Sequence, residues 1–508
     1  MGWVAGFRST VWWASLRKTK LGSAGCQTRT AEGARPCAAR SGVATLLLPK
    51  DAANWSADEP ERVMPCIGLW LLGGGAAAAP MSRKRTSLER AGDSDAQLDS
   101  SAPLSQEKRP RVALLSVHFE GNLGDEYETT PLLQRLSDWG AEVDAYSDPW
   151  LDPTDQSIAH TRTRELKFVN TFYTSDQWLT DSESLLSSDP PTLPGGLYDI
   201  LIIAPGPGSP PLRLSSILKL AESTETPLAM VGVSMPGGEY PFERDRYRHG
   251  YDPLRLVILR EPVSFAIAAP ELGFNNLSTT ERDPITDVTD GHVRVMMSGD
   301  TSWSFAPRDS ELRAWQGTYS KEFSARFGDT EPWYVLFLRY PDHLLEGTNS
   351  THLVVKDIDG STMVVPIARS ILANDDQSAR GDAETHEEMQ SRFKLAPDQL
   401  ISLESVEQML GLVGCMGPSS NLVVISDRYH PAQAAARMGA TIKLMSNAPV
   451  HNMFDGRIRG ADSPESIKMF GAHQMFTNYS SAEIMALNDA AWSALELEVQ
   501  VAKRRLRY

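Results

Sequence analysis

Arg428 and His430 are the residues whose types and spacing most directly indicate chemistry. They follow the apolar run Leu422–Ile425 and precede an alanine-rich segment, Pro431–Met438, that is expected to be a helix. At an extended strand end, residues i and i+2 point to the same side, so both side chains are expected on one face. A guanidinium binds anions, and an imidazole exchanges protons near neutral pH. The sequence therefore predicts an anion-binding and proton-transfer pair at the carboxyl end of a strand, where open α/β sheets bind ligands.

Three further polar residues follow predicted strands. Arg260 ends the run Leu254–Leu259, Asp300 follows a strand ending near Met297, and Arg339 follows Leu338. The planar fork of an arginine binds carboxylate or phosphate in a bidentate manner, so both arginines are candidate anion-binding residues. A surface salt bridge is the alternative for Arg260. Asp300 is a candidate for orienting ligand hydroxyl groups.

The segment GNLGDE, residues 121–126, lies between the first predicted strand and a helix. Gly121 and Gly124 allow a ligand to approach the backbone, and the helix start offers N–H groups to an anion. Asn122 belongs to the same candidate binding loop. Asp125 would repel phosphate, so it is expected either to bind sugar hydroxyls or to cap the helix.

Two series of apolar runs alternate with helical stretches and must position these residues. The first series begins at Arg111–Val117 and the second at Trp333–Leu338. Such alternation is typical of parallel sheets with crossover helices. The sequence thus predicts an α/β fold with two doubly wound Rossmann-like domains facing a cleft, which is a GT-B-like arrangement, and it predicts the active site in that cleft.

The predicted domain boundaries follow these series. Residues 111–305 form the N-terminal Rossmann-like domain, 306–331 a connector without strand signal, and 332–475 the C-terminal Rossmann-like domain. Residues 476–508 form a C-terminal helix that we expect to pack back on the first domain.

Composition excludes some classes of function. The net charge is −16, and because residues 1–110 contain 15 Lys/Arg and 10 Asp/Glu, the remaining chain carries −21. An acidic body argues against nucleic-acid binding, which needs basic surface. Only Cys415 of the four cysteines lies in this body. The sequence therefore predicts neither a disulfide framework nor a metal site.

Residues 1–110 are expected to be a disordered or targeting extension. The first 50 residues hold eight Lys/Arg and one acidic residue, a composition typical of transit peptides. Residues 64–79 are apolar but short for a membrane span, so membrane contact is expected only if they act as an anchor. We expect a cytoplasmic body, with Golgi or plastid targeting left open, and Met64 and Met81 as alternative starts.

The stretch IIAPGPG, followed by a strand that ends at Ser234, resembles the start of class I glutamine amidotransferase domains. Those enzymes need a nucleophilic cysteine where this chain has Ser234. Because thioester chemistry needs a thiolate, glutaminase activity is not expected.

Taken in order, the blocks GNLGDE, IIAPGPG, LREPVS, SGDTSWSF and VVISDRYHPAQAAARMGA resemble the polysaccharide pyruvyl transferase family over about residues 112–455. The resemblance implies a GT-B-like fold, transfer of a pyruvyl group from phosphoenolpyruvate to a sugar hydroxyl as a ketal, and no cofactor. Departures are Glu261, where an aspartate is frequent, and His451–Met453, where a lysine-containing stretch often follows.

The resemblance also implies roles for individual residues. His430 becomes the general acid, Arg428 the clamp for the donor's phosphate or carboxylate, and Arg260 a second donor-binding residue. The expected partners are phosphoenolpyruvate and a glycan acceptor. Two alternatives remain open: a GT-B glycosyltransferase that uses a nucleotide sugar, and a non-catalytic glycan-binding relative.

Overall fold

The structure is a computed structural model, and it describes the following residues: 109–117, 122–147, 168–173, 192–206, 211–235, 253–272, 274, 286–290, 292–328, 331–339, 347–376, 387, 390–391, 393, 395–415, 421–445 and 464–505. Most of the predicted extension, Gly121 and the apolar run 64–79 lie outside them. Residues Asp99–Tyr508 belong to one compact unit. Among the helices that the structure describes, none combines the length and apolar character that crossing a membrane requires.

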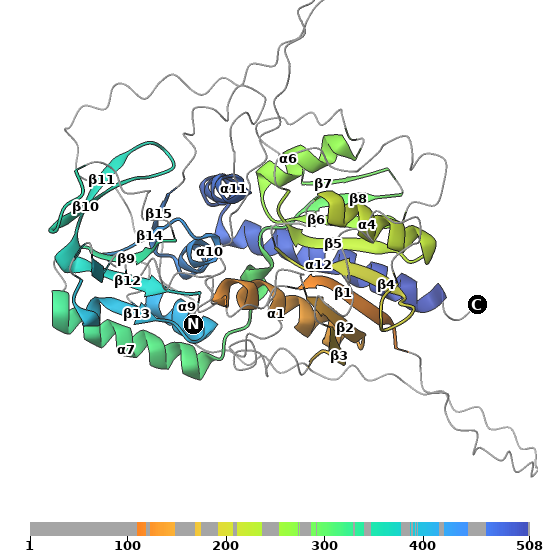
Figure 1. The fold of residues 1–508 in the computed structure, drawn as a ribbon, viewed down its shortest axis with the longest axis horizontal. Helices are drawn as coiled ribbons and strands as arrows, with labels where there is room; N and C mark the ends of the chain where they lie inside the picture. Colours follow the sequence, from red (N-terminus) through yellow and green to blue (C-terminus); the bar gives the residue numbers. More distant parts are fainter. Residues whose placement is uncertain are drawn as a thin grey trace, which may run out of the picture. The chain divides into compact units, whose positions relative to one another are not determined.

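The first sheet has eight strands in the order β3-β2-β1-β4-β5-β6-β8-β7 (Figure 1). Its neighbours pair in parallel, except β7 and β8, which pair antiparallel. The central strands are mostly apolar runs because both faces of a parallel sheet are covered. The strands are β1 (Arg111–Val117), β2 (Glu142–Ser147), β3 (Thr171–Tyr173), β4 (Ile200–Ile203), β5 (Leu228–Val233), β6 (Leu254–Leu259), β7 (Asp287–Thr289) and β8 (Arg294–Met297).

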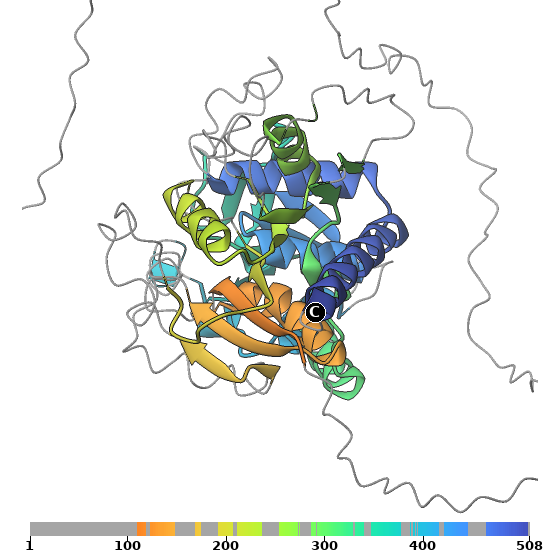
Figure 2. The ribbon, with the colours of Figure 1, turned by 90° about the vertical axis from the view of Figure 1, so that its right-hand side faces the viewer.

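Helices cover both faces of this sheet. Alternate residues of β1 point to opposite faces: Val112 and Leu114 join the core beneath α1 (Leu123–Asp138) and α12 (Ser481–Arg505). Ala113 and Leu115 join the core beneath α4 (Pro211–Ser223) and α6 (Pro262–Glu271). The first sheet is therefore doubly wound, and α12, drawn in dark blue, packs back on it as the sequence predicts (Figure 2).

The second sheet has five parallel strands in the order β13-β12-β9-β14-β15. They are β9 (Trp333–Phe337), β12 (Ser370–Asn374), β13 (Leu400–Ser402), β14 (Leu422–Ser426) and β15 (Thr441–Leu444). On one face they share a core with α7 (Asp309–Phe327), α9 (Val406–Val413) and α10 (Tyr429–Met438). Two parallel, Rossmann-like sheets in one chain confirm the predicted α/β, GT-B-like fold class.

The other face of the second sheet packs against the antiparallel hairpin of β10 (His352–Lys356) and β11 (Thr362–Pro366). Leu353, Val355 and Val365 of this hairpin share the core on that face with Phe393, which is helical.

Several smaller elements join the two halves. Residues 309–327, in the segment predicted as a connector, form the helix α7, and its Tyr319 and Phe323 pack in the core of the second sheet. The short helix η3 (Thr301–Ser304) follows β8, while α11 (Pro464–Asn478) contacts both α6 and α10. Two more short helices among the described residues are η5 (Ile367–Arg369) and η6 (Pro397–Gln399).

Candidate functional site

The Arg428–His430 segment lies between β14 and α10. The strand ends at Ser426, Arg428 is extended with φ −101° and ψ 133°, and the helix begins at Tyr429. Strand alternation therefore stops before His430, and the expectation that the arginine and the histidine share one face is wrong. The two side chains contact different carboxylates.

Arg428 pairs with two acidic residues at the carboxyl end of β12. Its Nη2 lies 3.3 Å from Oδ2 of Asp376 and 3.5 Å from Oδ2 of Asp375. All three side chains are buried. The Arg428 backbone is fixed as well, because its N–H donates to Ser426 Oγ and its carbonyl accepts from that hydroxyl. The guanidinium thus has a defined position at the edge where β14 and β12 end.

His430 joins a second cluster, centred on Glu128 of α1. Oε2 of Glu128 accepts hydrogen bonds from Arg260 Nη1 at 2.6 Å and from His430 Nε2 at 2.9 Å. An ionised carboxylate only accepts, so Nε2 carries a proton. Glu128 lies in α1, which packs on the first sheet, and His430 lies in α10, which packs on the second. Oε2 of Glu128 therefore links the two halves of the fold.

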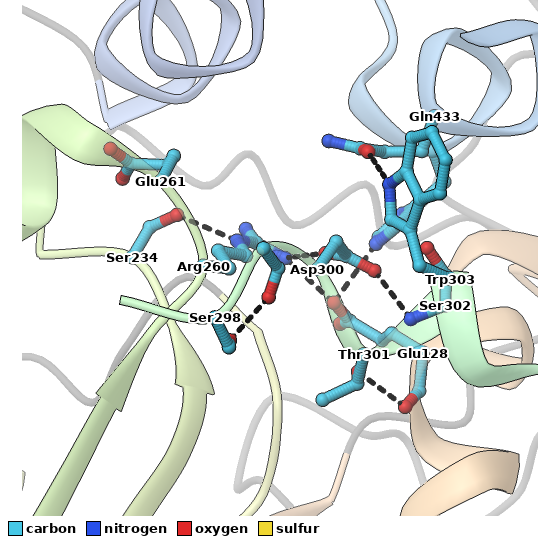
Figure 3. Close-up of polar contacts among 12 residues, drawn as sticks. Glu128, Ser234, Arg260, Glu261, Ser298, Asp300, Thr301, Ser302, Trp303 and Gln433 are labelled. Carbon is cyan, nitrogen blue, oxygen red and sulfur yellow. Dashed lines mark hydrogen bonds and ion pairs between the residues drawn. The ribbon is translucent and has the colours of Figure 1, made fainter. Parts of the chain in front are cut away.

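Arg260 is the centre of this cluster (Figure 3). It is 1% exposed, its Nε donates to Ser234 Oγ at 2.6 Å, and its Nη1 lies 3.4 Å from Asp300 Oδ2. Its guanidinium carbon also lies 4.2 Å from the ring centroid of Tyr429. Such burial and pairing exclude the exposed salt bridge that was the alternative for Arg260. Ser234 Oγ thus serves as a hydrogen-bond acceptor for Arg260.

Electrostatics keep this cluster charged. Burial alone lowers the pKa of His430, but the charge and the hydrogen bond of Glu128 outweigh it, and the net pKa is raised. Burial likewise lowers the pKa of Arg260, but Glu128, Tyr429 and Asp300 raise it by more, so the net pKa is raised. The imidazole is therefore stabilised as a cation beside the permanently charged guanidinium.

Gly124 gives the His430 ring its space. A Cβ placed on Gly124 would lie 2.1 Å from His430 Nδ1, so no larger residue fits without movement. Its N–H donates to Oδ1 of Asn122 at 2.8 Å, and Asn122 is the N-cap of α1. Asp125 stands in the first turn of that helix, which suits the helix dipole. These contacts explain the loop structurally, and its predicted role in ligand binding stays a prediction.

Asp300 and Arg339 occupy different surroundings. Asp300 is buried, faces Arg260, and caps η3 through a bond from the Ser302 N–H to Oδ1. Arg339 is exposed just after β9, and its backbone N–H donates to both carboxylate oxygens of Asp427. Asp300 is thus joined to the Arg260 cluster, while Arg339 lies at the edge of the second sheet.

A metal ion was not predicted, yet Glu128, Asp300 and His430 offer ligand atoms within 4.8 Å of one another. Carboxylate and imidazole groups are ordinary metal ligands. In this structure Arg260 bridges the two carboxylates and supplies the positive charge that a cation would bring.

Sequence reasoning missed Glu128, Asp375, Asp376 and Tyr429. Glu128 stands four residues after Gly124, on the same face of α1, and this helical spacing was the available signal. The two aspartates follow a short strand that was not predicted, so nothing in the sequence placed them beside Arg428.

Comparison with known proteins gives no family for this chain. No protein-family model and no curated protein matches it. Solved structures of similar shape include UDP-GlcNAc 2-epimerase from Neisseria meningitidis bound to UDP-GlcNAc, with 10% identity, 77% of this chain and 99% of that chain covered, and a TM-score of 0.40.

Two further solved structures have a similar shape. UGT89C1 from Arabidopsis thaliana has 12% identity, with 78% of this chain and 100% of that chain covered and a TM-score of 0.36. The calicheamicin glycosyltransferase CalG4 has 9% identity, with 78% and 99% covered and a TM-score of 0.33. At such scores these similarities add nothing to the strand order described above and carry no argument about activity.

Proposed function

We propose that this chain is a pyruvyl transferase, which moves a pyruvyl group from phosphoenolpyruvate to a sugar hydroxyl of a glycan or polysaccharide and forms a ketal. The observation that carries the proposal is the shared oxygen of Glu128, which brings Arg260 and His430 together from the two halves of the fold. These are two of the residues to which the resemblance assigns donor binding and catalysis, and Arg428 is the third.

The charges support an anionic donor. Phosphoenolpyruvate carries a phosphate and a carboxylate, and Arg260, Arg428 and protonated His430 offer three positive charges. Burial disfavours the charged forms of Glu261 and Asp375 and raises the pKa of both carboxyl groups. The carboxylates that now pair with the arginines would compete with the donor, so binding is expected to rearrange these pairs.

The chemistry needs a proton donor and a stabilised leaving group. One sugar hydroxyl attacks C2 of the donor while C3 gains a proton and becomes a methyl group. Phosphate then leaves as a second hydroxyl closes the ketal, and the hydroxyl protons pass to a base and to phosphate. The His430 imidazolium is suited to protonate C3, and an arginine is suited to hold the departing phosphate.

A glycosyltransferase that uses a nucleotide sugar is the second candidate function. The GT-B-like pair of sheets favours it, because strand ends from both sheets can line one donor site. In that case Arg260 and Arg428 would face a diphosphate. A non-catalytic glycan-binding protein is the third, and for it substitution of His430 would leave ligand binding intact.

The test uses the full-length chain with phosphoenolpyruvate, UDP-sugars and a panel of glycosides. A ligand that binds only the folded state raises the melting temperature, so phosphoenolpyruvate is expected to do so and UDP-sugars are not. Mass spectrometry then identifies the pyruvyl adduct on an acceptor. His430→Gln should abolish the adduct, and His352→Gln, at an exposed position, should leave it unchanged.

Stabilisation by UDP-sugars with no response to phosphoenolpyruvate would overturn the proposal in favour of the second candidate. An adduct that forms undiminished with folded His430→Gln would remove the role assigned to His430.

A further inference from the structure

Asp375 is a buried acid that contacts Arg428 but whose carboxyl group lacks a hydrogen-bond partner in the described part of the chain. It directly follows β12, its side chain is 1% exposed, and neither Oδ1 nor Oδ2 has a hydrogen-bond partner among the described residues. Arg428 Nη2 lies 3.5 Å from Oδ2 of Asp375, which is an ion-pair contact. Buried polar groups are nearly always satisfied, so this one calls for an explanation.

The neighbouring acids show that the lack of partners is specific to Asp375. Glu261 is also fully buried with a raised pKa, but its carboxyl accepts from both the N–H and the hydroxyl of Ser264. Asp300 caps η3. Asp376 accepts from Arg428 at 3.3 Å. Each of these three accepts a hydrogen bond, whereas the Asp375 carboxyl has the 3.5 Å ion-pair contact with Arg428 and no hydrogen bond among the described residues.

The surroundings favour a neutral Asp375. Burial is the strongest influence and raises its pKa; the charges of Arg428 and His430 lower it, Asp376 raises it, and the net shift is upward. From α1, the Leu123 N–H donates to the backbone carbonyl of Asp375. In its protonated form the acid would offer an O–H donor without an acceptor among the described residues, beside Arg428.

We propose that Asp375 is a further substrate-binding residue, which donates a hydrogen bond from its protonated carboxyl to an oxyanion of the donor at Arg428. This inference rests on the proposed function, because it assigns part of that donor site. An ionised aspartate would repel the anion, whereas a neutral one adds a charge-assisted hydrogen bond to the guanidinium's attraction. The bound anion would in turn accept the hydrogen bond for which the carboxyl has no partner among the described residues.

The test compares Asp375→Asn with Asp375→Ala in the full-length chain. The asparagine amide can still donate, so its affinity for phosphoenolpyruvate is expected to stay close to that of the unmodified chain. The alanine variant loses a hydrogen bond to a charged group and should bind about ten- to a hundredfold more weakly. Asp398→Asn is the matched control, since that side chain is 71% exposed and pairs with Arg326. Affinities are measured by calorimetric titration, and folding is checked by circular dichroism.

Dependence on pH gives a second readout. The titration of His430 and of the ligand itself is common to both proteins, so the ratio of affinities between the unmodified chain and Asp375→Asn isolates Asp375. As pH rises and Asp375 loses its proton, the unmodified chain should bind phosphoenolpyruvate progressively more weakly relative to Asp375→Asn. If Asp375→Ala fails to fold, this ratio alone decides.

Three results would overturn the proposal: unchanged affinity of Asp375→Ala, equal weakening in both variants, or a ratio that does not vary with pH. The same titrations are run with inorganic phosphate and with UDP. If the unmodified chain binds one of these but not phosphoenolpyruvate, the proposed function fails, and the variants are judged with the anion that binds. If it binds none of the three, both proposals fail.

Discussion

His430 Nε2 lies 2.9 Å from Oε2 of Glu128, although 302 positions separate the two residues in the sequence. The same oxygen accepts from Arg260. One carboxylate therefore fixes the orientation and charge of the predicted general acid and of the predicted donor-binding arginine. This makes Glu128 the residue on which the geometry of the site depends most.

Substitution of Glu128 by glutamine keeps the shape and removes the charge. We expect the pKa of His430 to fall, because the glutamate charge and hydrogen bond are what raise it. Removing one partner of a buried pair should also lower the free energy of unfolding by about 3 kcal/mol. Urea denaturation and histidine NMR titration measure these effects. Glu311→Gln, which breaks the exposed pair with Arg308, is the control and should cost no more than about 1 kcal/mol. An unchanged His430 titration would contradict the role given to Glu128.

Substitution of Gly124 by alanine tests the packing of the imidazole. The new methyl group would meet His430 Nδ1 and Cγ at 2.1 and 2.6 Å, so the ring must move away from Glu128. Overpacking of this kind typically costs about 1–3 kcal/mol, and we expect loss of product formation beyond the loss of stability. Gly317→Ala in α7 is the control, because nothing lies within 4 Å of its added Cβ. Activity equal to that of the control would show that the ring position is unimportant.

The central strands could be predicted from the sequence because their residues are mostly apolar. Strands such as β4 and β5 are buried on both faces, and their continuous runs stand out from the flanking polar segments. The three-residue strands β3, β7 and β13 could not, since so few residues give no period. The helix α11 was missed as well, because its apolar residues show little helical periodicity.

The candidate site was predictable only in part. Arg260 and His430 were singled out because each stands next to the end of an apolar run, and parallel strands bring such ends to one edge. Glu128 and Asp375 depend on which edges of the two sheets meet, and local sequence carries no such information. The shared face predicted for Arg428 and His430 failed because the helix begins at Tyr429, two residues earlier than Pro431 indicated.

The last helix is expected to hold Asp300 in place. Asn488 of α12 is buried, and its Nδ2 donates to the Asp300 carbonyl at 2.9 Å. Asn488→Leu would remove this hydrogen bond. Because the carbonyl still accepts from the Trp303 N–H at 3.1 Å, the variant should lower the unfolding free energy by about 0.5–1.5 kcal/mol. Asn478→Leu, at an exposed position, is the control and should stay within about 0.5 kcal/mol. Equal stability of the two variants in urea denaturation would show that the contact does not matter.

Stability should depend on pH through His430. Because its pKa is raised in the folded state, protonation stabilises the fold, and this contribution is complete below the unfolded pKa of about 6.5. It is lost as pH rises from there through the folded pKa. We therefore expect the difference in unfolding free energy between the unmodified chain and His430→Gln to shrink as pH increases across this range. In a Glu128→Gln background the difference should lose most of its pH dependence, since the charge that raises the pKa is gone. A difference that stays constant from acid to alkaline pH would mean that His430 is not held as a cation by Glu128.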